Sequence, residues 1–249
     1  MDSLFLELPA IIYNDTFKEF VKKGSIKPFY YVGTGNPNAK VLIIGKESAI
    51  EETDIVGKQW YDKNANDWQN HIDNGTCEVL EYEVGANHLL RKGWGKNTWS
   101  KYQQLSKYAF SEPDKSHYVD FLKNCFTTEI NDAPSKNTST AKKHGLNSRK
   151  QLFKDSAYIQ QFPVVVLACS NYITNNETIR EIDEIFRVSY AGDETGKYYY
   201  NKGNWFYLHY SADRLKLVIH TRQLSADVKA ELLSDMGKII KEHLKLTEN

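Results

Sequence analysis

The fold is decided by a stretch near the end of the chain that reads LKLVIHTRQLS from Leu215 to Ser225. An apolar run ends there on His220, and a short polar turn leads into an amphipathic segment that extends to Leu246. Short apolar runs of this kind are typical of buried strands. Because ligands of open α/β sheets bind beyond the carboxyl ends of such strands, His220 is a candidate site residue. The alternative is a histidine that only caps the strand and satisfies a backbone group.

A second strand end lies early in the chain, where VLIIGKESA contains Gly45 and Glu47. Gly45 allows a turn that a Cβ would hinder, and Glu47 follows in that turn. A carboxylate and a histidine at the ends of two buried strands can share one crevice. The alternative for Glu47 is a carboxylate that only stabilises the start of a helix through the helix dipole.

Strands and helices alternate along the chain, which implies parallel pairing with right-handed crossovers. We expect an α/β fold, a three-layer α/β/α sandwich with a central, mostly parallel four-stranded sheet and an added aromatic-rich β-hairpin. The expected strands are residues 41–44, 126–130, 163–168 and 216–219, and the expected helices are residues 15–23, 98–110, 148–161, 177–186 and 224–244.

Two segments stand outside this plan, and we expect both to be insertions in a single domain spanning residues 1–249. Residues 61–96 are polar and fit neither a metal site nor a regular helix. Residues 188–210 are dense in aromatics around turn-like glycines and predict an antiparallel hairpin. The hairpin aromatics suit either core packing or stacking on unpaired bases.

Composition limits the class of protein. At 249 residues, of which 41% are hydrophobic, the chain can bury a full core. It contains no run of about 18 apolar residues and no basic, apolar leader, so we expect neither a membrane span nor a signal peptide. Three widely spaced cysteines fit reduced thiols in a cytoplasmic protein, and no zinc spacing is present. We expect a cytoplasmic monomer without a metal.

The charge distribution bears on nucleic-acid binding. A formal net charge of zero weighs against it, because phosphate contacts usually leave a basic footprint. Between Asp132 and Asp155, however, no acidic residue occurs, and the loop over residues 133–150 is expected at the same sheet edge as the two candidate residues. It could hold phosphates or be a solvated loop that binds nothing. Its cations, with the helix that follows, are Lys136, Lys142, Lys143, Arg149, Lys150 and Lys154.

The two strand-end motifs together resemble those of the uracil-DNA glycosylase superfamily. GKESA from Gly45 corresponds to the family's glycine-headed motif with a carboxylate, and HTRQLS from His220 corresponds to its histidine-headed motif of the form HPSPLS. The lead-in GNPNAK from Gly35 is similar to that of the thermostable branch, and Gly57 precedes Trp60 as a glycine precedes the family's stacking aromatic. The resemblance spans residues 30 to 240.

The resemblance implies hydrolysis of the N-glycosidic bond that joins a base to deoxyribose in DNA, after the base has left the helical stack. Glu47 would stabilise the cationic sugar or orient the water, and His220 would donate a hydrogen bond to the departing base. No cofactor would be needed. The base would be bound by Gly45, Trp60, Glu129 and Asn131, and the DNA by Arg222, Leu224 as the wedge, Ser225, Lys136, Lys142 and Lys143.

Departures from the family pattern keep alternatives open. Both motifs lack proline, and Lys46 stands where the thermostable branch has its acidic residue. Glu129 occupies the position of a base-reading asparagine, and an ionised carboxylate only accepts hydrogen bonds, which favours a base other than uracil. The chain could therefore be a nucleic-acid-binding relative without catalysis, or an unrelated α/β enzyme that handles a nucleotide or small anion. Trp60 and Leu224 could equally be packing residues.

Overall fold

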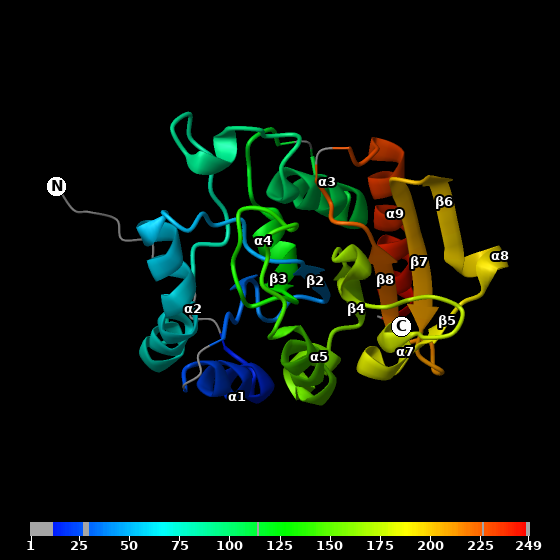
Figure 1. The fold of residues 1–249 in the computed structure, drawn as a ribbon, viewed down its shortest axis with the longest axis horizontal. Helices are drawn as coiled ribbons and strands as arrows, with labels where there is room; N and C mark the ends of the chain where they lie inside the picture. The colour runs from blue at the N-terminus through cyan, green and yellow to red at the C-terminus, as the bar shows by residue number, and fades with distance from the viewer. Residues whose placement is uncertain (1–11, 27–29, 114, 226, 248–249) are drawn as a thin grey trace.

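A mixed eight-stranded sheet forms the centre of the computed structural model, which describes residues 12–26, 30–113, 115–225 and 227–247 (Figure 1). The strand order is β1-β3-β2-β4-β8-β7-β5, and β6 pairs with β7. The strands are β1 (Thr34–Gly35), β2 (Val41–Gly45), β3 (Cys125–Glu129), β4 (Val164–Leu167), β5 (Ser189–Tyr190), β6 (Lys197–Asn201), β7 (Asn204–Tyr210) and β8 (Leu217–Thr221).

Helices cover both faces of this sheet (Figure 1). Alternating strand residues feed two hydrophobic cores: Leu42 packs with the residues of α1, α2, α5 and α7, whereas Ile43 packs with those of α3 and α9. The helices are α1 (Asp15–Gly24), α2 (Ile55–Asn74), α3 (Thr98–Phe110), α4 (Phe121–Asn124), α5 (Leu146–Asp155), α6 (Ala157–Gln160), α7 (Glu181–Phe186), α8 (Asp193–Gly196) and α9 (Ala230–Thr247), with 3-10 turns η1 (Leu89–Arg91) and η2 (Ser170–Tyr172).

The predicted α/β class is confirmed, but the expected mostly parallel four-stranded sheet is corrected. The strands β3, β2, β4 and β8 are parallel neighbours, while β1, β5, β6 and β7 pair antiparallel. The hairpin is not an addition beside the sheet. Strand β7 pairs along the whole of β8, with Tyr207 opposite His220, because Phe206 and Leu208 alternate into the core shared with β8.

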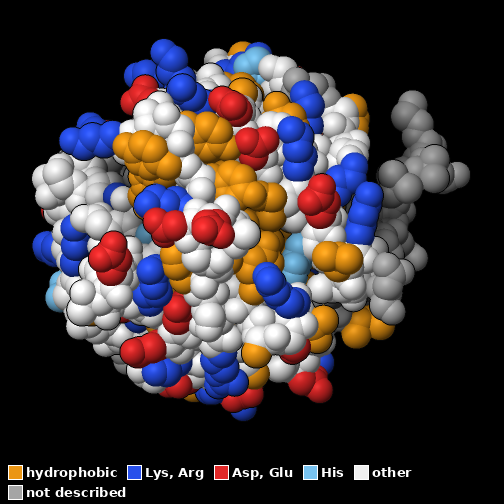
Figure 2. Space-filling model, turned by 90° about the vertical axis from the view of Figure 1, so that its right-hand side faces the viewer, with side chains coloured by type: hydrophobic (Ala, Val, Ile, Leu, Met, Phe, Trp, Pro, Cys, Tyr) orange, Lys and Arg blue, Asp and Glu red, His pale blue; other side chains and the backbone are white. Residues whose placement is uncertain are grey.

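The aromatic residues of β6 and β7 divide between the two faces of the sheet. Tyr198, Tyr200 and Phe206 pack with the α3 and α9 core, while Trp205 and Tyr207 lie partly exposed on the other face. Figure 2 shows hydrophobic side chains gathered at this end of the molecule, among charges of both signs. About half of the aromatic rings of the hairpin therefore pack against the core.

Several helix boundaries differ from the prediction. Helix α2 runs to Asn74, so the first part of the segment expected to be irregular is helical. The buried residues of α2 recur at i, i+3, i+4 and i+7, as in an amphipathic helix. Most of the helix surface is exposed and polar, so this helical period is hard to recognise in the sequence. The expected helix over 148–161 is divided by the cap at Ser156, and the last helix begins at Ala230 rather than 224. Among the described residues, no helix has the length and apolarity that a membrane span requires.

Candidate functional site

The carboxyl ends of the four parallel strands meet at one edge of the sheet. Gly45 is in register with Glu129 on the neighbouring strand β3. On the other side, Ile44 pairs with Leu167, which pairs with His220. Two strand spacings correspond to about 10 Å between the backbones of Ile44 and His220. The sequence-predicted residues Gly45, Glu129 and His220 are thus brought to one edge.

Glu129 lies over Gly45, where any Cβ would overlap its carboxyl group. Part of the Glu129 side chain is accessible, but its Oε2 is buried and has no hydrogen-bond partner among the described residues. Burial, helped by the nearby Glu47, raises the pKa of Glu129 from 4.5 to about 8. At neutral pH this carboxyl group therefore carries a proton, and it can both donate and accept a hydrogen bond as an amide does.

Arg149 lies in the interior behind Glu129, not on the loop surface where the sequence suggests a phosphate contact. Its Nε donates to the Glu129 carbonyl at 3.0 Å, and its Nη2 donates to the Tyr31 carbonyl at 2.6 Å and to Thr128 Oγ1 at 2.9 Å. Its Nη1 and the hydroxyl of Tyr61 are buried and have no partner in the described part of the chain. The Tyr61 ring stacks on Tyr31 at 4.5 Å. A buried cation thus stabilises the strand end that carries Glu129.

Glu47 is held by side chains from two other segments. Tyr172 of η2 donates its hydroxyl to Glu47 Oε2 at 2.5 Å, and Asn131 Nδ2 lies 3.4 Å from the same oxygen. Asn131 Nδ2 also donates to the Lys142 carbonyl at 3.0 Å, which ties the basic loop (residues 133–150) to this turn. Glu47 is only 8% exposed. Its carboxylate therefore has a fixed position at the end of β2.

Two lysine side chains lie close to the Tyr172 ring, whose hydroxyl binds Glu47. The ammonium groups of Lys46 and Lys143 lie 4.9 and 4.6 Å from the centre of the Tyr172 ring. Burial lowers the pKa of Lys46, and the positive charges of Lys143 and Arg222 lower it further, whereas Glu47 raises it. Lys143, predicted to contact DNA, thus lies over the ring whose hydroxyl binds the carboxylate predicted to be catalytic, and the charge of Arg222, also predicted to contact DNA, acts on Lys46.

The other predicted phosphate contacts are placed differently. Lys136 forms an ion pair with Glu51 at 2.7 Å. Arg222 Nη1 donates to the Gly203 carbonyl at 2.7 Å, which anchors part of its guanidinium to the β6–β7 turn. Lys142 is exposed on the basic loop, and Ser225 lies partly exposed before α9. Only part of the predicted set is therefore available at the surface around the site.

His220 has hydrogen-bond partners at both ring nitrogens. Its Nε2 lies 3.0 Å from the Ser170 carbonyl, and its Nδ1 lies 3.2 Å from Asn175 Nδ2. Burial lowers the pKa of His220 to about 4, so the imidazole is neutral at physiological pH. His220 and Glu47 are both bonded to η2, through Ser170 and Tyr172. In this conformation the histidine satisfies a backbone carbonyl, the role considered as the alternative.

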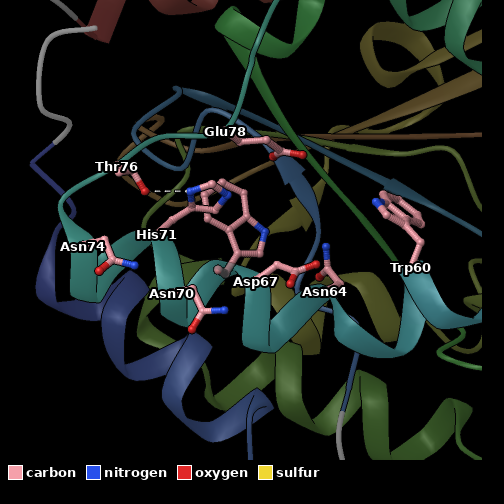
Figure 3. Close-up of a pocket in the computed structure, with 9 residues that line it drawn as sticks. Trp60, Asn64, Asp67, Asn70, His71, Asn74, Thr76 and Glu78 are labelled. Carbon is pink, nitrogen blue, oxygen red and sulfur yellow. Dashed lines mark hydrogen bonds between the residues drawn. The ribbon is translucent and has the colours of Figure 1, made fainter. Parts of the chain in front are cut away.

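Trp60 lines a different pocket from the strand-end residues. It lies on the first turns of α2 and is 46% exposed. Figure 3 shows it beside Asn64, with Asp67 and Glu78 further along the same hollow, whose volume is about 460 Å³. The described residues that line this pocket do not include Glu47, Glu129 or His220.

Leu224 is fully buried in the core between the sheet and helices α3 and α9. A wedge that fills the space of an extruded base must protrude from the surface. The predicted wedge role is therefore corrected to the packing alternative, because the chain turns inward before α9 begins.

Three residues of the site were missed by the sequence analysis. Tyr172 and Ser170 follow the end of β4, so the rule that identified Glu47 and His220 would have identified them too. Asn175 lies further along the same connection and carries no sequence signal. Among the described residues, no group of three or more His, Cys, Asp or Glu side chains could hold a metal ion.

Comparison with known proteins leaves the resemblance as a prediction. No model of a known protein family matches the chain, and no curated protein matches it.

Proposed function

We propose that this protein hydrolyses the N-glycosidic bond of an atypical or damaged base that has been extruded from DNA. The observation that supports this most directly is a pair of unlike carboxyl groups at adjoining strand ends. Glu129 has a buried oxygen without a partner among the described residues and a pKa raised to about 8, whereas Glu47 accepts hydrogen bonds from Tyr172 and Asn131. Two neighbouring carboxyl groups held in such unlike surroundings are typical of active sites in which the two groups have different roles. The helices on both faces of a sheet with a parallel centre accord with the expected family fold.

The chemistry assigns each group a role. As the bond breaks, positive charge grows on the sugar and negative charge on the departing base. Glu47 stabilises the sugar cation or orients the attacking water. Protonated Glu129 reads the base edge with one donor and one acceptor, as an asparagine would, so uracil stays within the range of substrates. Lys46, Lys143 and Arg222 supply positive charge for the flanking phosphates.

His220 takes part only when a ligand competes with the Ser170 carbonyl for its Nε2 proton. A neutral imidazole that keeps this proton can donate to an anionic base without becoming charged. Stabilising the anionic base in this way requires a hydrogen-bond donor on His220 and no transfer of its proton.

The test uses labelled oligonucleotides that carry uracil, hypoxanthine, xanthine or a mismatched base, single-stranded and duplex, with alkali to break abasic sites. Glu47→Gln should remove all strand breaks, because the amide cannot balance a cationic sugar. Glu52→Gln is the matched control, since this exposed glutamate lies in the same segment. Breaks with the parent and the control but not with Glu47→Gln support the proposal. If the parent leaves every substrate intact, the chain is not a glycosylase for these bases.

A second candidate is nucleic-acid binding without cleavage. The observations that favour it are the bonded nitrogens of His220 and the burial of Leu224 in the core. In that case Glu47→Gln leaves DNA affinity unchanged, no substrate is cut, and affinity falls steeply with salt as several phosphate contacts require. An enzyme for a small anion would instead show a shallow salt dependence.

A further inference from the structure

A chain of polar side chains runs from the surface to His220 on the side of the ring that faces away from Ser170. It starts at Asp183 of α7, passes through His209 of β7 and Asn175, and ends at His220 of β8. His209 and His220 are diagonal neighbours on one face of the sheet, since His209 is opposite Val218 and His220 is opposite Tyr207. His209 is fully buried. Asp183, His209 and Asn175 are not otherwise used by the proposed mechanism.

Arg180 determines which way the Asn175 amide points. Its Nη1 lies 3.0 Å from Asn175 Oδ1, and its guanidinium stacks on the Tyr190 ring at 4.1 Å. A guanidinium can only donate hydrogen bonds, so the Asn175 oxygen must face Arg180. The Asn175 NH₂ group must then face the two histidines, and its nitrogen lies 3.2 Å from His209 Nε2 and 3.2 Å from His220 Nδ1.

The amide orientation in turn determines where both histidines carry their protons. An NH₂ group only donates, so His209 Nε2 and His220 Nδ1 must both accept and neither carries a proton. His209 places its proton on Nδ1, which donates to Asp183 Oδ1 at 2.6 Å. His220 places its proton on Nε2, which donates to the Ser170 carbonyl at 3.0 Å. The two histidines therefore have opposite tautomers.

We propose that Asn175 is a positioning residue that fixes His220 as the neutral tautomer with its proton on Nε2, and that Arg180, His209 and Asp183 orient Asn175 for this task. His220 Nε2 then carries the proton that donates to the Ser170 carbonyl or to a ligand that displaces this carbonyl, and the same nitrogen has no lone pair to act as a base. The value of this donor for catalysis rests on the proposed function, whereas the tautomers themselves do not. Burial and the charge of Arg180 lower the pKa of His209 against the opposing effect of Asp183, which is the direction that favours the neutral ring required by the contact with Asn175.

The experiment is ¹⁵N NMR of the full chain with labelled histidine, in which long-range couplings to the ring protons distinguish the two tautomers. The expected result is a proton on Nδ1 for His209 and on Nε2 for His220, both neutral near pH 7. The first of these is the less common form of a free imidazole, so the pattern does not arise by default. The same tautomer at both residues, or a charged His220, would overturn the proposal without any variant.

Asn175→Asp tests the role of the amide with almost no change of shape. A carboxylate accepts but cannot donate, so His220 should take a proton on Nδ1 and its titration midpoint should rise by about 1 to 3 pH units. Asn176→Ala is the matched control, because Asn176 caps the backbone of Thr178 and Ile179 in the same connection. The control should leave both tautomers unchanged. An unaltered His220 in Asn175→Asp contradicts the proposal.

Activity separates this inference from the proposed function. If the parent cuts DNA, Asn175→Asp should lower kcat and move its pH profile, whereas a structural defect alone would lower stability and leave the profile in place. If the parent cuts no substrate but shows the opposite tautomers, the proposed function fails and the positioning role of Asn175 stands.

Discussion

Replacing Glu129 with glutamine should remove a large part of the pH dependence of stability. Burial over Gly45 raises the pKa of this carboxyl group from 4.5 to about 8, so the folded protein binds a proton that the unfolded chain releases. Between these two values, stability falls as pH rises, because ionisation favours the unfolded state. Below pH 4.5 both states are protonated and the penalty is absent.

The magnitude follows from the width of this window. Each pH unit in which only the unfolded carboxyl ionises costs about 1.4 kcal/mol, so the parent should lose about 2.5 kcal/mol between pH 5 and pH 7 through Glu129 alone. A glutamine cannot ionise and lacks this loss. Glu78, whose pKa burial raises to about 7, adds a similar dependence, but it is present in both proteins and cancels in their difference.

The assay is urea unfolding followed by tryptophan fluorescence at pH 5, 6, 7 and 8. The difference in unfolding free energy between Glu129→Gln and the parent should grow by about 2.5 kcal/mol from pH 5 to pH 7. Glu52→Gln, at an exposed position, controls for the loss of one carboxylate. If the unfolding free energies of the parent and Glu129→Gln change in parallel with pH, Glu129 ionises in the folded protein at neutral pH. This result would refute the proposed role of protonated Glu129 in binding the base.

Three further predictions follow from the packing around the site. Gly45→Ala should lower stability by about 1 to 3 kcal/mol in urea unfolding, because the new methyl group overlaps the Glu129 carboxyl, and by less in a Glu129→Ala background. Arg149→Met should cost at least about 3 kcal/mol, since it leaves buried acceptors without donors, and a thermal shift of only a degree or two would contradict this. Leu224→Ala should cost about 2 to 5 kcal/mol as a core truncation, with DNA affinity of the folded protein unchanged; lost affinity at full stability would restore the wedge.

The elements that the sequence predicted well are those whose signals are local. The apolar run of β4 has no polar interruption, and α3 begins and ends at the predicted residues, with Asn97 as the cap of its first turn. The strand β7 is different. The alternation of apolar and polar residues in β7 predicted a hairpin. The pairing of β7 with β8 depends on contacts between residues that are distant from the hairpin turn, and no local sequence pattern indicates them.

The candidate site shows the same division between local and distant signals. The strand-end rule brought Gly45 and His220 to one edge, and the resemblance added Glu129, which lies at the same edge. It could not foresee that Arg149, an ordinary cation in a basic segment, would turn inward and donate to three acceptors. Nor could it predict that Glu129 would keep its proton, since that property comes from burial and not from residue type.

The short turn η2 has a consequence for how this sequence can change over generations. Ser170, in a left-handed backbone conformation with φ of 50°, accepts from His220, and Tyr172 two residues later donates to Glu47. A substitution of Glu47 or His220 removes one of the two hydrogen bonds that hold this turn. We expect the turn to move as a result and to displace the residue that is still bonded to it. We therefore expect Glu47, Tyr172 and His220 to be substituted together in evolution. Replacements that are tolerated in combination should be harmful when they are introduced one at a time.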